Sequence, residues 1–407
     1  MPDTSSREIL IFGAGNIGRS FVGQIFGRAG YAPVFADVDR GLVDALNRQG
    51  TYTVVHRHPD GHEERLSIPD VSAVRADDPD AVEPVLQRVR FVATSVGAAI
   101  LPKILPTLAE EAIRRYESGR TPFNLILAEN IHGGGEMARD AILAHFPGGP
   151  GEVHYEGSTP HGGVPGVVEC SVGKMVPIVP EELRRKEPTT VYAEAFNTLL
   201  VDADGWAGPL PDVPQIRPVR PIQAWVDRKL YIHNLGHAAT AYLGHLYRPE
   251  LRYIKDVIDD ASVYREVRTA MEAAGTGLQN EYSGVFSDND ITGHIEDLLY
   301  RFASPILGDT VFRVGRDIRR KLSAGDRIAG ALHLLRRHQL PTDAVERIYR
   351  AALHFRAQDE TGNLFPEDER FHRELQAHPE PTTFLAELSG FDPYTDAPLL
   401  ERLLGDG

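Results

Sequence analysis

One stretch in the C-terminal half combines a lysine, an asparagine and a histidine at short intervals: Lys229, Asn234 and His237. In a helix with about 100° between successive residues, Lys229, His237 and Asn234 point at roughly 0°, 80° and 140° around the axis. A desolvated lysine can act as a base, an amide can donate to a developing alkoxide, and a histidine can hold a hydroxyl group. The spacing therefore favours a site that interconverts an alcohol and a carbonyl. A polar helix face with a solvated lysine has the same spacing, so a second motif must decide.

A glycine-rich turn near the N-terminus provides that motif. The apolar run 9–12 leads directly into Gly13, Gly15 and Gly18, and a helical apolar pattern follows. In a dinucleotide-binding unit the first glycine permits the tight turn, the second admits the pyrophosphate and the third lets helix and strand pack closely. The helix N-terminus then attracts the phosphates. The candidate cofactor-binding residues are Gly13, Gly15, Asn16, Ile17, Gly18 and Asp37.

Asp37 indicates which cofactor this turn binds. It ends a second predicted strand, 34–36, and follows Gly18 by 19 residues. An acidic residue near this spacing accepts hydrogen bonds from the adenosine ribose hydroxyls and repels a 2′-phosphate. We therefore predict NAD rather than NADP as the cofactor. The nearby cation Arg40 favours the opposite choice, because it would attract a 2′-phosphate.

Two further predicted strands, 90–97 and 123–128, end at the same edge of the sheet. The second delivers Asn130 there, so Asn130 is a candidate neighbour of the nicotinamide. Capping the helix that begins near Gly135 is an equally good explanation of this asparagine. Cys170 is the single cysteine, which excludes an internal disulfide, and its sequence context predicts a buried apolar residue rather than a nucleophile.

The length of the chain and its proline-rich segment predict two domains. A chain of 407 residues exceeds the usual size of one hydrophobic core. The predicted fold class is α/β, with a Rossmann-type doubly wound parallel sheet domain over 1–208 and a mostly α-helical domain over 209–407. The boundary is placed at a group of five prolines, Pro209, Pro211, Pro214, Pro218 and Pro221. The helices expected beyond it are 222–245, 262–274, 288–303, 326–337 and 342–355.

The net charge of −15 opposes nonspecific binding to nucleic acid or to an anionic membrane surface. No apolar run is long enough to span a membrane and the N-terminus lacks a signal-peptide core, so we expect a cytoplasmic protein. Against this acidic background stands a basic segment that contains Arg313, Arg316, Arg319, Arg320, Lys321 and Arg327. If the segment is helical, Arg313, Arg316 and Arg320 share a face. That face is either a solvated helix surface or a site that binds a phosphate monoester, and the second alternative makes the more specific prediction.

Together these motifs resemble the polyol-specific long-chain dehydrogenases and, within them, the mannitol-1-phosphate 5-dehydrogenases. The resemblance rests on 12–19, on 35–38, on the Lys229–Asn234–His237 motif with 241–244, on 301–305 and on 313–323. It implies metal-independent chemistry with Lys229 as the base, Asn130 and Asn234 as donors to the alkoxide, and His237 orienting the hydroxyl. It also implies that Arg316, Arg320 and Lys321 bind substrate.

The implied reaction interconverts mannitol 1-phosphate and fructose 6-phosphate with NAD, in a monomer or homodimer whose partner is a small polyol or sugar phosphate. The alternatives are a dehydrogenase of free mannitol, a keto-uronate reductase, and a regulator that senses NAD without turnover. The chain departs from the family pattern at Gly173, which replaces a usual aspartate, and at Ser304, which replaces a usual asparagine. Both departures bear on the identity of the polyol.

Overall fold

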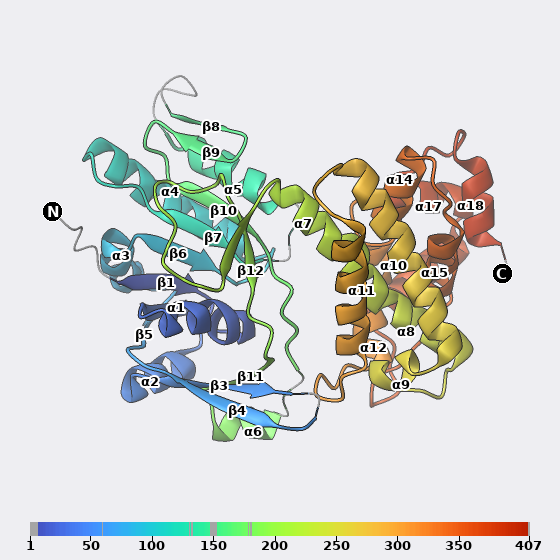
Figure 1. Ribbon diagram of the computed structural model, residues 1–407, viewed down its shortest axis with the longest axis horizontal. Coiled ribbons are helices and arrows are strands. Elements are labelled where there is room, and N and C mark those ends of the chain that lie inside the picture. Colours follow the sequence, from blue (N-terminus) through green and yellow to red (C-terminus); the bar gives the residue numbers. More distant parts are fainter. Residues whose placement is uncertain are drawn as a thin grey trace. The chain divides into compact units, whose positions relative to one another are not determined.

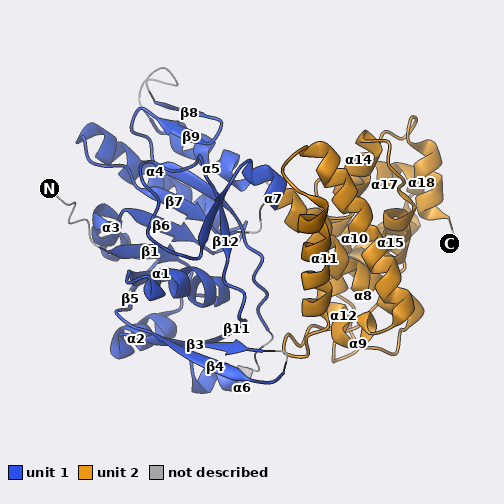
Figure 2. Cartoon of the chain, viewed as in Figure 1, with its two compact units in different colours: residues 1–225 blue, residues 226–407 orange. Residues whose placement is uncertain are grey.

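The computed structural model describes residues 7–58, 60–129, 131, 133–146, 153–177, 179 and 181–405. The chain divides into two compact units, residues 1–225 and 226–407 (Figure 2). The division falls within helix α7 (Ile222–Arg228), whereas the sequence placed the boundary between residues 208 and 209. None of the described helices is both long and apolar enough to cross a membrane.

Unit 1 is built on an eight-stranded sheet with the order β13-β12-β10-β7-β6-β1-β2-β5 (Figure 1). The strands are β1 (Glu8–Phe12), β2 (Ala32–Asp37), β5 (Ser72–Arg75), β6 (Phe91–Thr94), β7 (Asn124–Leu127), β10 (Gly166–Ser171), β12 (Leu199–Asp202) and β13 (Ile216–Val219). From β5 to β10 all neighbouring strands are parallel, and the pairing of β10 with β12 is antiparallel. The mostly parallel sheet predicted for this half is confirmed.

Strand β1 shows why the sheet lies at the centre of the unit. Ile9 and Ile11 pack into the core on one face, and Leu10 and Phe12 pack into the core on the other. A strand that is apolar on both faces must be covered on both, which βαβ crossovers achieve. One face carries η1 (Gly18–Gly23), α1 (Gln24–Arg28) and α2 (Arg40–Gln49); the other carries α3 (Pro79–Arg88), α4 (Leu101–Glu117) and α5 (Gly134–Leu143).

Two small sheets complete unit 1. Strand β3 (Tyr52–Arg57) pairs with β4 (Glu63–Ile68) and with β11 (Thr190–Glu194), which follows the short helix α6 (Glu181–Lys186). Strands β8 (His154–Glu156) and β9 (Thr159–His161) form a hairpin. The proline-rich segment contributes strand β13, which contains Pro218 and pairs along one side with β12. An edge strand tolerates proline because its outer N–H groups need no partner.

Unit 2 is largely helical, as predicted. Its elements beyond α7 are η2 (Lys229–Asn234), α8 (Leu235–Tyr247), α9 (Ile254–Ile258), α10 (Ala261–Glu281), α11 (Asp288–Phe302), α12 (Val311–Gly315), α13 (Ile318–Lys321), α14 (Ala329–Arg337), α15 (Asp343–Leu353), α16 (Pro366–Ala377), α17 (Pro381–Ser389) and α18 (Ala397–Leu404). The five helices expected from the sequence are all present, although α10 runs on to Glu281. The first of them comprises α7, η2 and α8.

Helix α8 is the central element of unit 2. It packs against α9, α10, α12 and α15, and every residue from Ala238 to Gly244 is buried. A helix that is buried all round needs small residues where its neighbours approach closely. At Gly236 an added Cβ would lie 2.5 Å from the sulfur of Met271 on α10. This packing fixes the start of α8, and with it the preceding turn that carries Lys229.

Candidate active site

The glycine-rich turn connects β1 to helix η1 at the carboxyl edge of the sheet. Gly13 has a φ of +94°, and its N–H donates to the Ala36 carbonyl oxygen at 2.8 Å, which closes the turn against β2. Gly15 and Asn16 are exposed and Ile17 is half-buried. The first turn of the helix therefore lies at an open edge, where its N–H groups and its dipole can bind an anion.

A pocket of about 740 Å³ adjoins this turn and is lined by residues of unit 1 alone. Its lining combines the turn and the end of β2 with the segment between α6 and β11. Arg19 joins these two parts, because its Nε donates to the Ala14 carbonyl oxygen at 2.6 Å and its Nη1 donates to the Pro188 carbonyl oxygen at 2.8 Å. Burial lowers the pKa of Arg19 to about 10, so the guanidinium keeps its charge at neutral pH. The volume lies in the range of ligand sites, and the charge suits a pyrophosphate.

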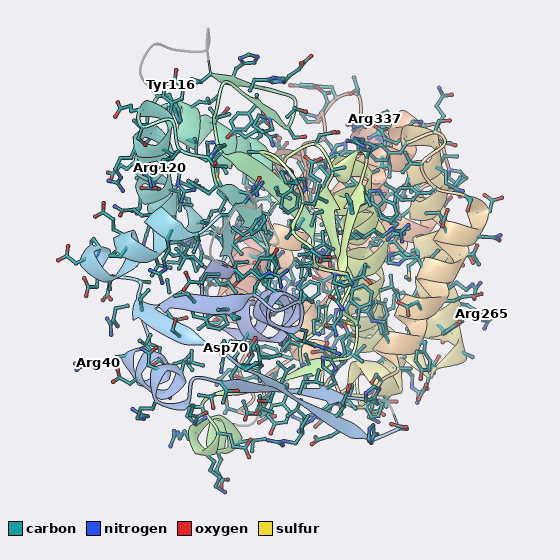
Figure 3. The ribbon with its side chains drawn as sticks, turned by 60° about the vertical axis from the view of Figure 1, so that its left-hand side comes forward. Arg40, Asp70, Tyr116, Arg120, Arg265 and Arg337 are labelled. Carbon is teal, nitrogen blue, oxygen red and sulfur yellow. The ribbon has the colours of Figure 1, made fainter. Side chains whose placement is uncertain are left out.

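Asp37 lies in this pocket and already holds the turn in place. One carboxylate oxygen accepts from the Ala14 N–H at 2.7 Å and the other from the Asp39 N–H at 2.9 Å. A carboxylate oxygen accepts more than one hydrogen bond, so both retain capacity for ribose hydroxyls. Arg40 is not part of the lining: it projects outward on α2 (Figure 3) and lies 3.8 Å from Asp44. The residues present fit the ribose and pyrophosphate of a dinucleotide.

The two glycines that flank the helix start are expected to respond differently to a methyl group. An alanine Cβ at position 18 would lie 1.9 Å from the Gly13 carbonyl oxygen, whereas at position 15 no heavy atom lies within 4 Å. Gly18→Ala should therefore destabilise the fold by about 1–3 kcal/mol. Gly15→Ala should leave the stability nearly unchanged and weaken NAD binding, because the methyl group occupies space needed by the pyrophosphate. Urea denaturation and NAD titration of both variants measure the two effects, and equal stability losses would contradict this assignment.

Helix η2 gives the Lys229–Asn234–His237 motif a geometry that the sequence did not predict. Residues 229–234 form π-helical turns rather than α-helical ones. Because π-helical hydrogen bonds join residues five apart, Asn234 lies one turn from Lys229 instead of far around the axis. Between residues 231 and 244, Asn234 and His237 are the positions that are not buried. Asn234 and His237 are therefore the accessible positions of this stretch, and Lys229, one π-helical turn before Asn234, is also partly exposed.

Lys229 is only partly exposed, and its surroundings suit a base. Burial, together with the nearby positive charge of Arg327, lowers the pKa of Lys229 to about 7. A lysine with this pKa is substantially neutral at physiological pH and can accept a proton. The side chain of Asn234, at the start of α8, makes no capping hydrogen bond and stays available to a ligand.

His237 is held between two neighbours. Its ring stacks on Phe302 with ring centres 4.9 Å apart and planes inclined by 13°, and its Nε2 lies 3.2 Å from a carboxylate oxygen of Asp309. Burial and surrounding cations, first of all Arg313, lower the pKa of His237 to about 3. The imidazole is therefore neutral at physiological pH.

The basic segment does not form the single helix face that was considered from the sequence. Helix α12 ends at Gly315, Asp317 adopts a left-handed conformation with φ of +69°, and α13 begins at Ile318. Asp368 on α16 stabilises this break, since its carboxylate accepts from the N–H groups of Asp317 at 3.0 Å and Ile318 at 2.7 Å. The expected alignment of the arginines is lost because of a contact from a distant helix.

The predicted substrate-binding residues of this segment lie in different environments. Arg320 forms ion pairs with Asp317 and Asp326, and the buried Lys321 donates to the main-chain carbonyl oxygens of Gly315 and Arg316. Burial, Arg327 and Arg320 lower the pKa of Lys321 to about 7. Arg316 is exposed and lies over the ring of Phe365 at 5.4 Å, without a carboxylate partner among the described residues. Arg316 is thus the best placed of the three to bind an external anion.

The remaining sequence predictions concern unit 1 and the family departures. Asn130 lies outside the described residues, and the N-cap position of α5 is occupied by Gly133. Cys170 is buried in the core, as predicted. Lys174, which follows Gly173, is buried and donates to the Asn197 side chain at 2.6 Å. The described residues contain no group of three His, Cys, Asp or Glu side chains that could hold a metal ion.

Two family models match the chain. The mannitol dehydrogenase Rossmann domain matches residues 7–214, and the mannitol dehydrogenase C-terminal domain matches residues 221–402. The chain belongs to the mannitol dehydrogenase family. It is accordingly an oxidoreductase with a Rossmann dinucleotide-binding domain. The predicted family is confirmed at this level, whereas the assignment to the mannitol-1-phosphate 5-dehydrogenases stays a prediction.

Two solved structures of this fold are similar over nearly the whole chain. A D-sorbitol dehydrogenase in substrate-free form is 16% identical, with a TM-score of 0.75, over 97% of this chain and 91% of that one. Mannitol 2-dehydrogenase of Pseudomonas fluorescens, in a ternary complex with NAD and D-mannitol, is 15% identical, with a TM-score of 0.74, over 98% and 90%. At these identities the similarity establishes the fold.

Sequence reasoning missed three residues around the motif. Asp309 and Phe302 contact His237, and Arg327 lowers the pKa of Lys229. Arg327 was visible as a member of the basic segment, but no short-range pattern links Asp309 or Phe302 to a histidine so far away in the chain.

Proposed function

We propose that this oxidoreductase is an NAD-dependent polyol-phosphate dehydrogenase that interconverts mannitol 1-phosphate and fructose 6-phosphate. The observation that carries the proposal is the partly buried Lys229 with a pKa of about 7, on the same helical segment as the partly exposed Asn234 and His237. A base, an amide donor and a neutral imidazole are the groups that oxidation of a secondary alcohol requires.

Bound NAD supplies the hydride acceptor, and the protein manages the proton. In the oxidative direction, neutral Lys229 takes the proton of the reacting hydroxyl. The substrate carbon that bears this hydroxyl loses a hydride to NAD, which leaves a ketone. Asn234 donates to the oxygen as negative charge develops on it, and His237 holds the hydroxyl in position. In reduction, protonated Lys229 returns the proton to the same oxygen.

The pocket of unit 1 supports NAD as the cofactor through Asp37. Asp37→Ala removes the acceptors for two ribose hydroxyls, and a hydrogen bond to a charged group contributes about 1.5–3 kcal/mol. The ratio of kcat/KM for NAD over NADP should therefore fall roughly tenfold to a hundredfold. Arg40→Ala is the matched control and should leave that ratio nearly unchanged, because Arg40 is exposed and lies beside Asp44. Equal use of NAD and NADP by the unaltered enzyme would refute this role of Asp37.

A second candidate, oxidation of a free polyol such as mannitol, is favoured by the ion pairs of the basic segment. Arg313 contacts Asp309, and Arg320 contacts Asp317 and Asp326, so these cations already have partners. Even so, the segment 309–327 contains six Lys and Arg residues and three Asp residues, which leaves a local positive excess in an acidic protein.

A substrate screen separates the two candidates. NAD reduction is measured with mannitol 1-phosphate, sorbitol 6-phosphate, mannitol and arabinitol, and NADH oxidation with keto-uronates. A phosphorylated polyol should have the highest kcat/KM. Highest efficiency with free mannitol would support the second candidate, and activity with a keto-uronate alone would exclude both. NAD binding without turnover of any substrate would indicate a regulator.

A further inference from the structure

His237 is fixed on two sides by residues of unit 2. Phe302, at the end of α11, stacks flat against the ring, and Asp309 approaches ring atom Nε2 to 3.2 Å. The separation is short enough for a hydrogen bond, although the ring is not fully aligned for one.

Asp309 is itself held rigidly. Its side chain is only 7% exposed, and it forms an ion pair with Arg313 one helical turn later. Its main-chain carbonyl oxygen accepts from the Ile254 N–H at 2.9 Å. The next residue, Thr310, caps α12 by accepting from the Arg313 N–H at 3.1 Å. The carboxylate therefore has a fixed position between Arg313 and His237.

A neutral imidazole carries one N–H group and one acceptor nitrogen, and a carboxylate can only accept. In a neutral His237, a carboxylate 3.2 Å from Nε2 favours the tautomer in which that nitrogen carries the hydrogen. The other nitrogen, Nδ1, is then the acceptor of the ring. A hydroxyl group of a substrate can donate to it.

We propose that Asp309 is a positioning residue that holds His237 as the Nε2–H tautomer and so presents Nδ1 as an acceptor for the substrate hydroxyl. This inference deepens the proposed function and rests on it for the identity of the ligand. The tautomer itself follows from contacts within unit 2 and is measurable without substrate.

The first measurement is ¹⁵N NMR of the full-length protein labelled at histidine, with His237→Asn identifying the His237 signals. The unaltered protein at neutral pH should show His237 as a neutral Nε2–H imidazole. An Nδ1–H tautomer, or an imidazolium, would overturn the proposal. The result does not depend on which substrate the enzyme uses, so it stays valid even if no polyol is oxidised.

Variants of Asp309 connect the tautomer to turnover. Asp309→Leu with Arg313→Met removes both partners of the ion pair, so that no charge is left unpaired in the interior. The double variant should lose the tautomer preference, and its kcat/KM for the best polyol should fall about tenfold to a hundredfold. Asp309→Asn keeps an acceptor oxygen and should retain most of the tautomer preference and most of the kcat/KM. Arg313→Lys keeps a cation beside Asp309, so it is the matched control and should retain the tautomer.

The outcomes distinguish a positioning role from a structural one. A purely structural role would change stability in urea denaturation and leave the His237 signals of the folded protein as they were. Retention of the Nε2–H tautomer in the double variant would overturn the proposal, whatever its activity. Loss of the tautomer with unchanged kcat/KM would show that the presented nitrogen does not serve the reaction, which would also overturn it.

Discussion

Lys229→Ala is expected to lower turnover about 10²- to 10⁴-fold, the range that a positioned general base contributes. NAD binding should be almost unaffected, because the glycine turn and Asp37, the proposed cofactor-binding residues, belong to the other unit. Lys255→Ala is a suitable control: Lys255 is a surface lysine of the same unit, and its hydrogen bond to Asp256 raises its pKa. Turnover and NAD affinity of both variants are compared with those of the unaltered enzyme. A Lys229→Ala enzyme that retained most of its activity would remove this residue from the reaction.

The pH profile tests the same role without removing the amine. Burial and Arg327 lower the pKa of Lys229 to about 7, so the neutral base becomes available as pH rises through 7. The kcat/KM for oxidation should rise across that range and level off above it, whereas reduction needs protonated Lys229 and should decline over the same range. Arg327→Met removes a cation that disfavours the ammonium form, so both profiles should move to higher pH. A kcat/KM that is independent of pH between 6 and 9 in both directions would argue against Lys229 as the titrating group.

The second large effect concerns the phosphate of the proposed substrate. Arg316 is exposed, rests on Phe365 and has no carboxylate partner in the described part of the chain, so a phosphate would gain a full charge-assisted contact from it. Such a contact contributes about 1.5–3 kcal/mol, which corresponds to roughly a tenfold to hundredfold change in kcat/KM. Arg316→Ala should cause this loss with the phosphorylated polyol and leave activity on the free polyol nearly unchanged.

Two neighbours provide the comparison. Arg320→Ala should have a smaller effect, because Arg320 already has Asp317 and Asp326 as partners. Arg319 forms an ion pair with Glu374 on α16, and Arg319→Ala should leave the phosphate preference unchanged. Equal losses with phosphorylated and free polyols in the Arg316 variant would mean that this residue maintains the fold and does not recognise phosphate.

Local patterns in the sequence were sufficient for the sheet and the cofactor turn. A tight turn that needs glycine, a strand that is apolar on both faces and an aspartate at the end of the next strand are all short-range features. The structure has each of these features: Gly13 has a positive φ, β1 packs into the core on both faces, and Asp37 lines the pocket. The helices of the C-terminal half were equally accessible, because helical periodicity is local.

The basic segment shows where local reasoning failed. Its arginines have helical spacing, but the helix is broken at Asp317. The N–H groups of Asp317 and Ile318 donate to the carboxylate of Asp368, which lies 51 and 50 residues further along the chain. Within this segment, ion pairs engage Arg313, Arg319, Arg320 and Arg327, and Arg316 is exposed without an acidic partner among the described residues. Spacing alone could not distinguish these arginines, because their partners were set by folding.

The sequence by itself determined the family, the sheet, the glycine turn and the presence of a lysine, an asparagine and a histidine on one helical segment. The tertiary structure decided what these residues can do. Packing around α8 buries residues 231–244 except Asn234 and His237. Desolvation and Arg327 lower the pKa of Lys229 to about 7. Asp309 and Phe302 fix the ring of His237 from distant parts of the chain. A pKa and a tautomer depend on the charges and burial around a group, and those exist only once the chain has folded.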